Sequence, residues 1–450
     1  MNLKKLYIGV LVCTLVPATA SAQSNGGVNS SYSRFGLGLP ADQSQGFNRS
    51  MGGVAQGLRS SNRINMLNPA SYSAMDSLTF LFDVGMGVER TLMHQNGRRQ
   101  AANSAAFDYV NAAFRVTRNL GMSVGFLPYT NIGYNFSQGK EITVDPISYQ
   151  TITQLLNYEG SGGLHQAYMG VGWRPFKGLS IGANLGFLWG NIQNQTLQSF
   201  AENGSTNSTS YSSLSTYYSS AVRTWKGDIG IQFQRLLNSS NLLTVGATVS
   251  IGHKIHSEAT MLRTSLNGDS INCSTKDAFQ LPMTYSAGVA WEHAQRLTVA
   301  ADFTYEKWST CITPKPIGDG VDIRYEATTG DYSDRWRINA GAEYVPGRYE
   351  RALRKRINYR AGAYYSSPNL VINGQEGPKE FGITAGVGIP ITNGWTRQYV
   401  LNAYAPSYVN IGVQWTRRDA GISTFIREDI FRINVGITFN ERWFMKWKFR

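Results

Sequence analysis

The stretch that decides the fold is Phe279 to Trp308, FQLPMTYSAGVAWEHAQRLTVAADFTYEKW, which predicts two strands joined by a turn at 292–295. Apolar residues alternate with small or polar ones along both arms, and a period of two indicates β-strands. The apolar faces are Leu281, Met283, Tyr285, Ala287, Val289 and Trp291 on the first arm, and Leu297, Val299, Ala301, Phe303 and Tyr305 on the second. Arms of about a dozen residues suit tilted strands that cross a bilayer, which need roughly 9 to 11 residues.

The first 22 residues (1–22) predict a secretory signal peptide. Lys4 and Lys5 precede an apolar run from Leu6 to Val16, and small residues at 20–22 predict cleavage before Gln23. After cleavage, no uninterrupted apolar run approaches the 18 or more residues of a membrane helix. A mature chain that spans a membrane must therefore do so with strands.

The composition fits a membrane barrel with a polar interior. The chain has 47 Gly, 24 Tyr, 20 Phe and 10 Trp, and only 16% of its residues are charged, against about 25% in ordinary soluble domains. The formal net charge is +13, but the arginines are scattered and form no nucleic-acid-binding signature. We therefore expect a protein of the Gram-negative outer membrane, in contact with its lipid, and no nucleic-acid partner.

Fourteen strands are expected along residues 77–440, with connections that are long after odd-numbered strands and mostly short after even-numbered ones. The expected strands span residues 78–90, 107–118, 122–136, 164–175, 179–192, 218–234, 242–256, 279–291, 297–308, 335–345, 357–365, 381–389, 408–416 and 431–439. Expected long loops include 137–163, 193–216, 257–278 and 309–334. Since every backbone group in lipid needs a partner, an even-numbered antiparallel sheet would close on itself, so the fold class is an all-β transmembrane antiparallel barrel.

Two segments flank this barrel. Residues 23–76 are rich in Gly, Ser and Asn but carry many apolar residues, which favours a hatch, or plug, packed in the lumen over a disordered tail. Residues 441–450, ERWFMKWKFR, form a basic and aromatic tail. That tail suits an extra short strand, a periplasmic interfacial segment or a docking peptide.

Six charged side chains fall on inward-facing positions of the expected strands. They are Asp302, Glu306, Arg335, Arg337, Glu343 and Arg432. They either line a solute path or pair across the lumen and hold the plug, because a charge in a confined interior needs a partner. Cys273 and Cys311 lie in expected external loops and form either a disulfide or two unpaired thiols.

The sequence predicts no enzyme, no metal site and no cofactor. The five histidines lack metal-ligand spacing, and no P-loop, GxSxG elbow or CxxC occurs. A hydrolase with a triad assembled from distant Ser, His and Asp residues is the remaining catalytic alternative, since triads are recognised by geometry.

Two motifs in the hatch resemble a known family. NRSMGGVAQGL at 48–58 and INMLNPASY at 64–72 contain Gly52, Gly53 and the Asn68-Pro69-Ala70 triplet, and they resemble the hatch of FadL-type outer-membrane transporters. The central hairpin and DRWRINAGAEYVPG at 334–347 are similar to the same family. The resemblance implies a fourteen-stranded barrel occluded by a hatch, which takes up hydrophobic compounds such as long-chain fatty acids and passes them through or sideways out of the wall.

These observations lead to two candidate functions, one in transport and one as a structural subunit. The first is passive, hatch-gated uptake of hydrophobic small molecules of the fatty-acid type. The alternative is a FadL-like structural barrel that scaffolds an outer-membrane assembly or secretion complex with lipoproteins or other barrels as partners. The predicted polar lumen and the basic tail motivate this alternative, since a hydrophobic ligand would call for an apolar pocket.

Overall fold

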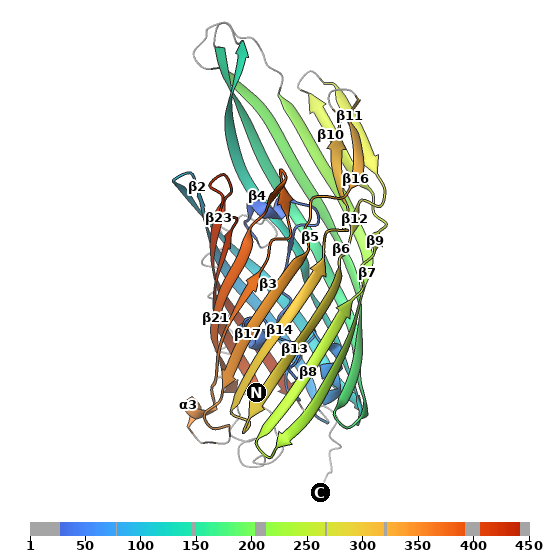
Figure 1. Cartoon of the computed structure of the whole chain (residues 1–450), viewed down its shortest axis with the longest axis vertical. Helices are drawn as coiled ribbons and strands as arrows, with labels where there is room; N and C mark the ends of the chain where they lie inside the picture. Colours follow the sequence, from blue (N-terminus) through green and yellow to red (C-terminus); the bar gives the residue numbers. More distant parts are fainter. Residues whose placement is uncertain are drawn as a thin grey trace, which may run out of the picture.

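The structure is a computed structural model that describes residues 28–77, 79–145, 150–202, 213–265, 268–318, 322–348, 350, 352–391 and 406–441. These residues form one tilted β-barrel with a segment of chain inside it (Figure 1). The expected signal peptide and all but the first residue of the expected C-terminal tail lie outside the described residues. No helix among the described residues is both long and apolar enough to span a membrane.

Fourteen strands, counted over the described part of the chain, form the closed wall. They are β2 (Phe80–Gln95), β3 (Arg98–Thr117), β4 (Leu120–Asp145), β5 (Gln150–Phe176), β6 (Leu179–Glu202), β7 (Leu214–Asn238), β8 (Asn241–Ser250), β13 (Met283–His293), β14 (Leu297–Lys307), β17 (Arg335–Tyr344), β18 (Asn358–Ser366), β21 (Lys379–Ile391), β22 (Ser407–Asp419) and β23 (Arg427–Glu441). Each pairs antiparallel with its neighbours, and β2 pairs with β23 from Phe80↔Glu441 to His94↔Arg427, which closes the sheet. The predicted fold class and strand number are confirmed.

Lipid-facing and lumen-facing residues alternate as the sequence predicts. Val299, Phe303 and Ile433 are 42%, 48% and 51% exposed on the outer surface, whereas Asp302 between the first two is 7% exposed in the lumen. Leu281 is an exception, because it is buried rather than lipid-facing. The first arm begins at Met283, since Pro282 has no backbone N–H for the ladder; Phe279–Gln280 form a separate strand, β12, with β9 (Lys254–Ile255).

The prediction of two long loops is wrong, because strands β4 to β7 continue far past the ends of the other strands of the wall. β4 and β5 pair from Leu120↔Trp173 to Asp145↔Gln150, which covers most of the loop expected at 137–163. β6 and β7 likewise pair through much of 193–216. These extensions rise above the rest of the barrel, beside the hairpin of β10 (Ala259–Ser265) and β11 (Ser270–Thr275) (Figure 1).

Smaller elements complete the loops. β15 (Thr313–Ile317) pairs with β16 (Arg324–Thr328), and β19 (Val371–Ile372) pairs with β20 (Gln375–Glu376). Helix α3 (Leu353–Arg356) lies between β17 and β18 at the opposite end, where the short turns are (Figure 1). Short turns face the periplasm in outer-membrane barrels, so the long β4–β7 extensions are extracellular.

The plug consists of residues 28–77, which lie inside the barrel. It contains η2 (Ser31–Arg34), β1 (Leu39–Pro40), α2 (Gly46–Arg49) and η3 (Pro69–Ala74). Phe47, Met51 and Val54 pack against Ala290 and Ala300 of the wall in one apolar cluster. Ile64, Met66 and Tyr72 belong to a second cluster with β2, β3, β4 and β5. The plug therefore has an apolar core of its own that continues into the wall.

Candidate functional site

Several buried charged residues lie where the plug contacts the wall, among them Arg49, Asp108, Asp302 and Glu343. Arg49 of α2 is 2% exposed, and its Nη1 lies 2.5 Å from Asp108 Oδ2 on β3. Its Nε lies 3.4 Å from Asp42 of the plug. Arg432 of β23 pairs with the same Asp108, so the plug, β3 and β23 share one buried ionic network.

A second network links the plug to β17. Arg63 Nη1 lies 2.8 Å from Glu343 Oε2, and Arg360 Nε of β18 donates to the same carboxylate at 2.7 Å. The side chains of Glu343 and Arg360 are 4% and 1% exposed. Two guanidinium groups therefore depend on one buried carboxylate, and one of the two belongs to the plug.

Asp302 of β14 binds the plug backbone. Its Oδ2 accepts hydrogen bonds from the backbone N–H groups of Ala55, at 2.5 Å, and Gln56, at 3.0 Å. This turn follows Gly52 and Gly53, whose φ angles of 71° and 79° are left-handed values that favour glycine. Two adjacent left-handed residues reverse the chain and aim its N–H groups at the carboxylate.

The Asn68-Pro69-Ala70 triplet begins η3. The Asn68 side chain accepts a hydrogen bond from the backbone N–H of Ala70 at 3.2 Å and donates to the carbonyl of Gln56 at 2.9 Å. Pro69 occupies the first position of the helix, where a missing N–H costs nothing. The triplet therefore caps a helix and joins it to the preceding turn of the plug.

Glycines on the inner wall bring the plug backbone into direct contact with the strands. A Cβ at Gly341 would lie 2.7 Å from the carbonyl carbon of Met51, and one at Gly182 would lie 2.5 Å from the backbone nitrogen of Ala70. A Cβ at Gly246 would overlap the carbonyl of Gln56. This glycine contact surface was not predicted from the sequence, although glycines at inward positions of otherwise regular strands could have indicated it.

The wall has one incomplete ladder among the described strands. β3 and β4 pair from Thr117↔Leu120 only as far as Val110↔Phe126. Beyond this point β1 takes the place of β3 along β4, with Leu39 opposite Asn131. Backbone bonds from Ser30 N to Gly133 O and from Ala41 N to Tyr129 O, both 2.9 Å, extend the contact. The start of the plug therefore closes the gap between β3 and β4 from within.

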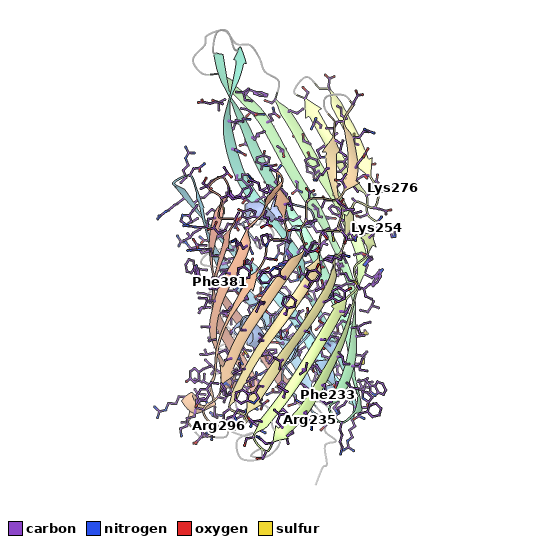
Figure 2. All side chains as sticks on the ribbon, viewed as in Figure 1. Phe233, Arg235, Lys254, Lys276, Arg296 and Phe381 are labelled. Carbon is purple, nitrogen blue, oxygen red and sulfur yellow. The ribbon has the colours of Figure 1, made fainter. Side chains whose placement is uncertain are left out.

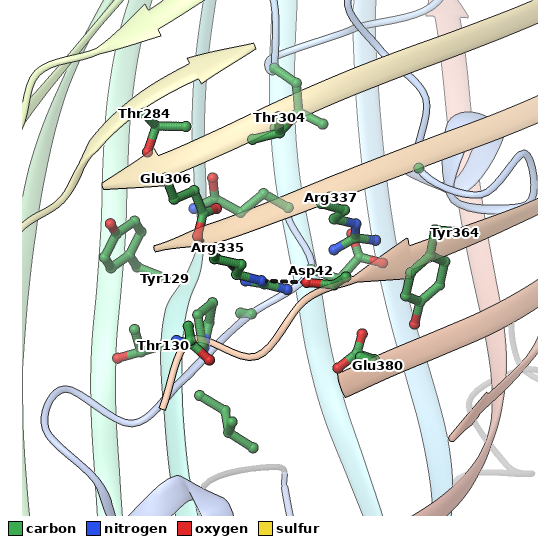
Figure 3. A pocket seen from close by; sticks show the side chains of 18 of the residues that line it. Asp42, Tyr129, Thr130, Thr284, Thr304, Glu306, Arg335, Arg337, Tyr364 and Glu380 are labelled. Atoms are coloured by element: carbon green, nitrogen blue, oxygen red, sulfur yellow. Dashed lines mark hydrogen bonds and ion pairs between the residues drawn. The ribbon is translucent and has the colours of Figure 1, made fainter. Parts of the chain in front are cut away.

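A cavity of about 310 Å³ remains between the plug and the wall. Asp42, Glu306, Arg335, Arg337, Tyr364 and Glu380 surround it (Figure 3). Arg335 pairs with Glu306 at 3.6 Å, Glu380 accepts from Arg418 at 2.8 Å, and the Arg337 guanidinium lies 4.2 Å from the Tyr364 ring centre. The lining is therefore mixed, because the carboxylates of Glu306 and Glu380 are paired with arginines while apolar side chains such as Leu281, Trp308 and Leu370 cover the rest.

The two cysteines among the described residues are free thiols in separate apolar clusters. Cys273 lies on β11 and donates to the carbonyl of Ile323, and Cys311 lies in the β14–β15 loop beside Trp308 and Tyr332. Burial raises the pKa of the Cys311 thiol to about 12, and the nearby carboxylates of Asp334 and Glu306 add to the rise. Of the two alternatives for these residues, the structure has the unpaired thiols.

The model of the protein family described as BamG matches residues 3–450, which is nearly the whole chain. The chain belongs to the BamG family. No curated protein matches the sequence. The family itself is therefore BamG, and the FadL-type resemblance concerns the fold that the solved structures below share.

Solved structures share the architecture of this BamG-family barrel at low sequence identity. The Pseudomonas putida toluene transporter TodX aligns with a TM-score of 0.56 and 15% identity, over 91% of this chain and 100% of that one. A Pseudomonas aeruginosa FadL homologue gives a TM-score of 0.56 and 12% identity, over 90% and 98%. The Ralstonia pickettii toluene transporter TbuX gives 0.54 and 14%, over 91% and 98%. At these identities the likeness establishes an outer-membrane barrel fold and nothing finer.

The six lumen candidates all point inward, and the structure divides them into two groups. Asp302 and Glu343 bind the plug directly, and Arg432 does so through Asp108. Glu306, Arg335 and Arg337 lie around the cavity, which Asp302 and Arg432 also line. Their partners Arg49, Arg63, Asp108 and Arg360 were not identified from the sequence. No group of three potential metal ligands occurs among the described residues.

Proposed function

We propose that this BamG-family protein is a sealed structural barrel that scaffolds an outer-membrane assembly or secretion complex, with lipoproteins or other barrels as partners. The observation that supports this most is the attachment of the plug at several points of the wall. Asp108 on β3, Asp302 on β14 and Glu343 on β17 each hold a different part of the plug. A conduit that opens by moving the whole plug would have to break these attachments in every transport cycle.

The cost of such breakage favours a permanent plug. Separating one partner from a buried ion pair typically costs 3–5 kcal/mol, because a charge is left buried without compensation. Withdrawal of the plug would separate Arg49 from Asp108 and Arg63 from Glu343. It would also expose the apolar clusters around Met51 and Tyr72. Without a dedicated energy source, the open state would therefore be rarely populated.

The extracellular side offers surfaces suited to partners. The β4–β7 extensions and the β10–β11 hairpin stand above the rim as a continuous sheet. Their inner side carries the partly exposed side chains of Phe136 and Tyr158, with the Arg34 guanidinium 4.0 Å from the ring centre of Tyr158. Tyrosine and arginine are enriched where protein partners bind.

Co-purification from native outer membranes tests this proposal. The full-length chain, carrying an affinity tag, would be extracted in mild detergent and its partners quantified by mass spectrometry. We expect stoichiometric lipoprotein or barrel partners, and we expect at least one to be lost when residues 259–275 are replaced by a short turn. Isolation of a solitary barrel under conditions that preserve other outer-membrane complexes would overturn the proposal.

The second candidate is hatch-gated uptake of hydrophobic small molecules. Two observations favour it: the structural neighbours described as toluene transporters, and the incomplete β3–β4 ladder. Outside this ladder lies an apolar groove lined by Phe82, Phe126, Met169, Phe187 and Trp225. An apolar solute that entered the plug region would meet this groove on leaving sideways.

Uptake measurements separate the two candidates. Cells that carry the full-length protein, a 23–76 deletion, or no protein would be compared for accumulation of labelled oleate and toluene. The scaffold proposal expects no difference between cells with the intact protein and cells with none. Accumulation that depends on the intact protein and changes with the deletion would support the transporter instead.

A further inference from the structure

The connection between β17 and β18 carries a dense positive charge at the periplasmic end. Its sequence at 345–357, VPGRYERALRKRI, holds five cations and one acid, which gives 5 − 1 = +4. Helix α3 lies within it and has no buried residues. Neither the plug nor the cavity uses this segment, so its charge requires another explanation.

The segment is held against the outer surface of the wall. The hydroxyl of Tyr359, which is 41% exposed on the lipid side of β18, donates to the carbonyl of Arg354 at 3.1 Å. Gly347 N donates to Lys355 O at 2.8 Å, which folds the segment back on itself. Figure 1 shows α3 projecting sideways from the barrel end, so it does not lie beneath the lumen.

The neighbouring side chains mark this position as the edge of the bilayer. Tyr344, Tyr359 and Ile391 are exposed at the last outward positions of β17, β18 and β21. Exposed tyrosines at strand ends lie at the level of the lipid headgroups. Leu353 on α3 itself is 48% exposed. The cations of α3 are therefore at headgroup depth.

Adjacent turns extend the basic surface. Val345 N donates to Arg296 O at 2.7 Å, which joins the β13–β14 turn to the segment. Figure 2 shows Arg296 and Arg235 at this end of the barrel, while Lys254 and Lys276 lie toward the other end. Within the segment, Lys355 pairs with Glu350 at 3.3 Å, and this is its single acid. Arg296, Arg348 and Arg354 form no ion pair with a carboxylate among the described residues, so an external anion would complete the site.

We propose that Arg348, Arg354 and Lys355, together with Arg296, bind the phosphate groups of anionic phospholipids in the periplasmic leaflet. Interfacial arginine and lysine residues bind such headgroups through charge and hydrogen bonds, while Leu353 and the tyrosines contact the acyl region. The site selects anionic over zwitterionic lipid and fixes the depth of the barrel at β17 and β18. This inference requires only the membrane barrel and holds for a scaffold and a transporter alike.

Native mass spectrometry of the full-length protein measures this selectivity. The purified barrel would be equilibrated with phosphatidylglycerol and phosphatidylcholine of equal chain length, and the retained lipids counted. We expect retention of phosphatidylglycerol in excess. The double variant Arg354→Gln/Lys355→Gln should reduce that preference about thirtyfold, the effect of removing two interfacial cations.

Three controls make the outcome decisive. Lys254→Gln/Lys276→Gln removes two exposed cations near the opposite end and should leave the preference unchanged. Arg354→Lys keeps the charge and should retain most of the preference. Heat-modifiable migration of each variant shows that its barrel is folded. The proposal is overturned if the double variant and the parent have the same lipid selectivity. It is also overturned if the double variant keeps its lipid selectivity but no longer binds an acidic protein that the parent binds.

Discussion

Replacement of Glu343 by alanine is the most informative perturbation of the plug. Glu343 accepts from Arg63 of the plug and Arg360 of β18, and its side chain is 4% exposed. Its removal leaves two buried guanidinium groups without a carboxylate. Arg360 retains a hydrogen bond to Asn410 at 2.6 Å, but Arg63 loses its one ion-pair partner among the described residues.

The magnitude follows from the burial of the pair. Removing one member of a buried ion pair costs about 3–5 kcal/mol, in contrast to about 0–1 kcal/mol for an exposed one. The loss should appear first as release of the plug near Arg63, because the strands on both sides keep their ladders. Glu343→Gln keeps an acceptor oxygen but removes the charge, so we expect a smaller effect in the same direction.

Urea unfolding in lipid vesicles measures the free energy, and trypsin cleavage after Arg63 reports plug release. We expect Glu343→Ala to lower the unfolding free energy by about 3–5 kcal/mol and to speed cleavage, while Glu376→Ala, at an exposed position on β20, changes neither. A Glu343→Ala protein with the stability and protease resistance of the parent would refute the reasoning that buried charge holds the plug.

Three further outcomes are expected. Val435→Arg places a charge on the lipid face and should cost about 2–4 kcal/mol by urea unfolding in vesicles; resistance equal to the parent would show the facing to be wrong. Gly341→Ala should cost about 1–3 kcal/mol by overpacking against Met51, whereas Gly139→Ala, in open surroundings, serves as its control. Because burial raises the pKa of Cys311 to about 12, its thiol stays protonated at pH 8, and mass mapping should find it unmodified by iodoacetamide until the protein unfolds.

The wall was predictable from sequence because lipid imposes a period of two on each strand. Leu297 to Tyr305 shows the pattern plainly, since hydrocarbon lies on one side and a polar lumen on the other. The upper halves of β4 to β7 carry no such contrast, because polar residues occupy successive positions there, as in Ser137-Gln138-Gly139-Lys140-Glu141. Residues 137–163 therefore predicted a loop, although their backbone groups continue the ladder.

The plug was predictable in outline but not in its attachments. Apolar residues among glycines indicated packing, and the Asn68-Pro69-Ala70 triplet indicated a folded hatch. The ion pair between Arg63 and Glu343 joins residues 280 positions apart, and no local pattern specifies that register. The small and polar inward residues predicted a polar lumen. The ion-pair partner of each charged residue could be identified only in the closed barrel.

Ion conductance of the purified full-length protein in a planar bilayer tests the central claim most directly. A plug held by Asp108, Asp302 and Glu343 predicts a silent barrel over the whole voltage range that the bilayer tolerates, and stepwise channels only after deletion of residues 23–76. Stable channels from the intact protein, with the conductance of the deletion variant, would contradict the account.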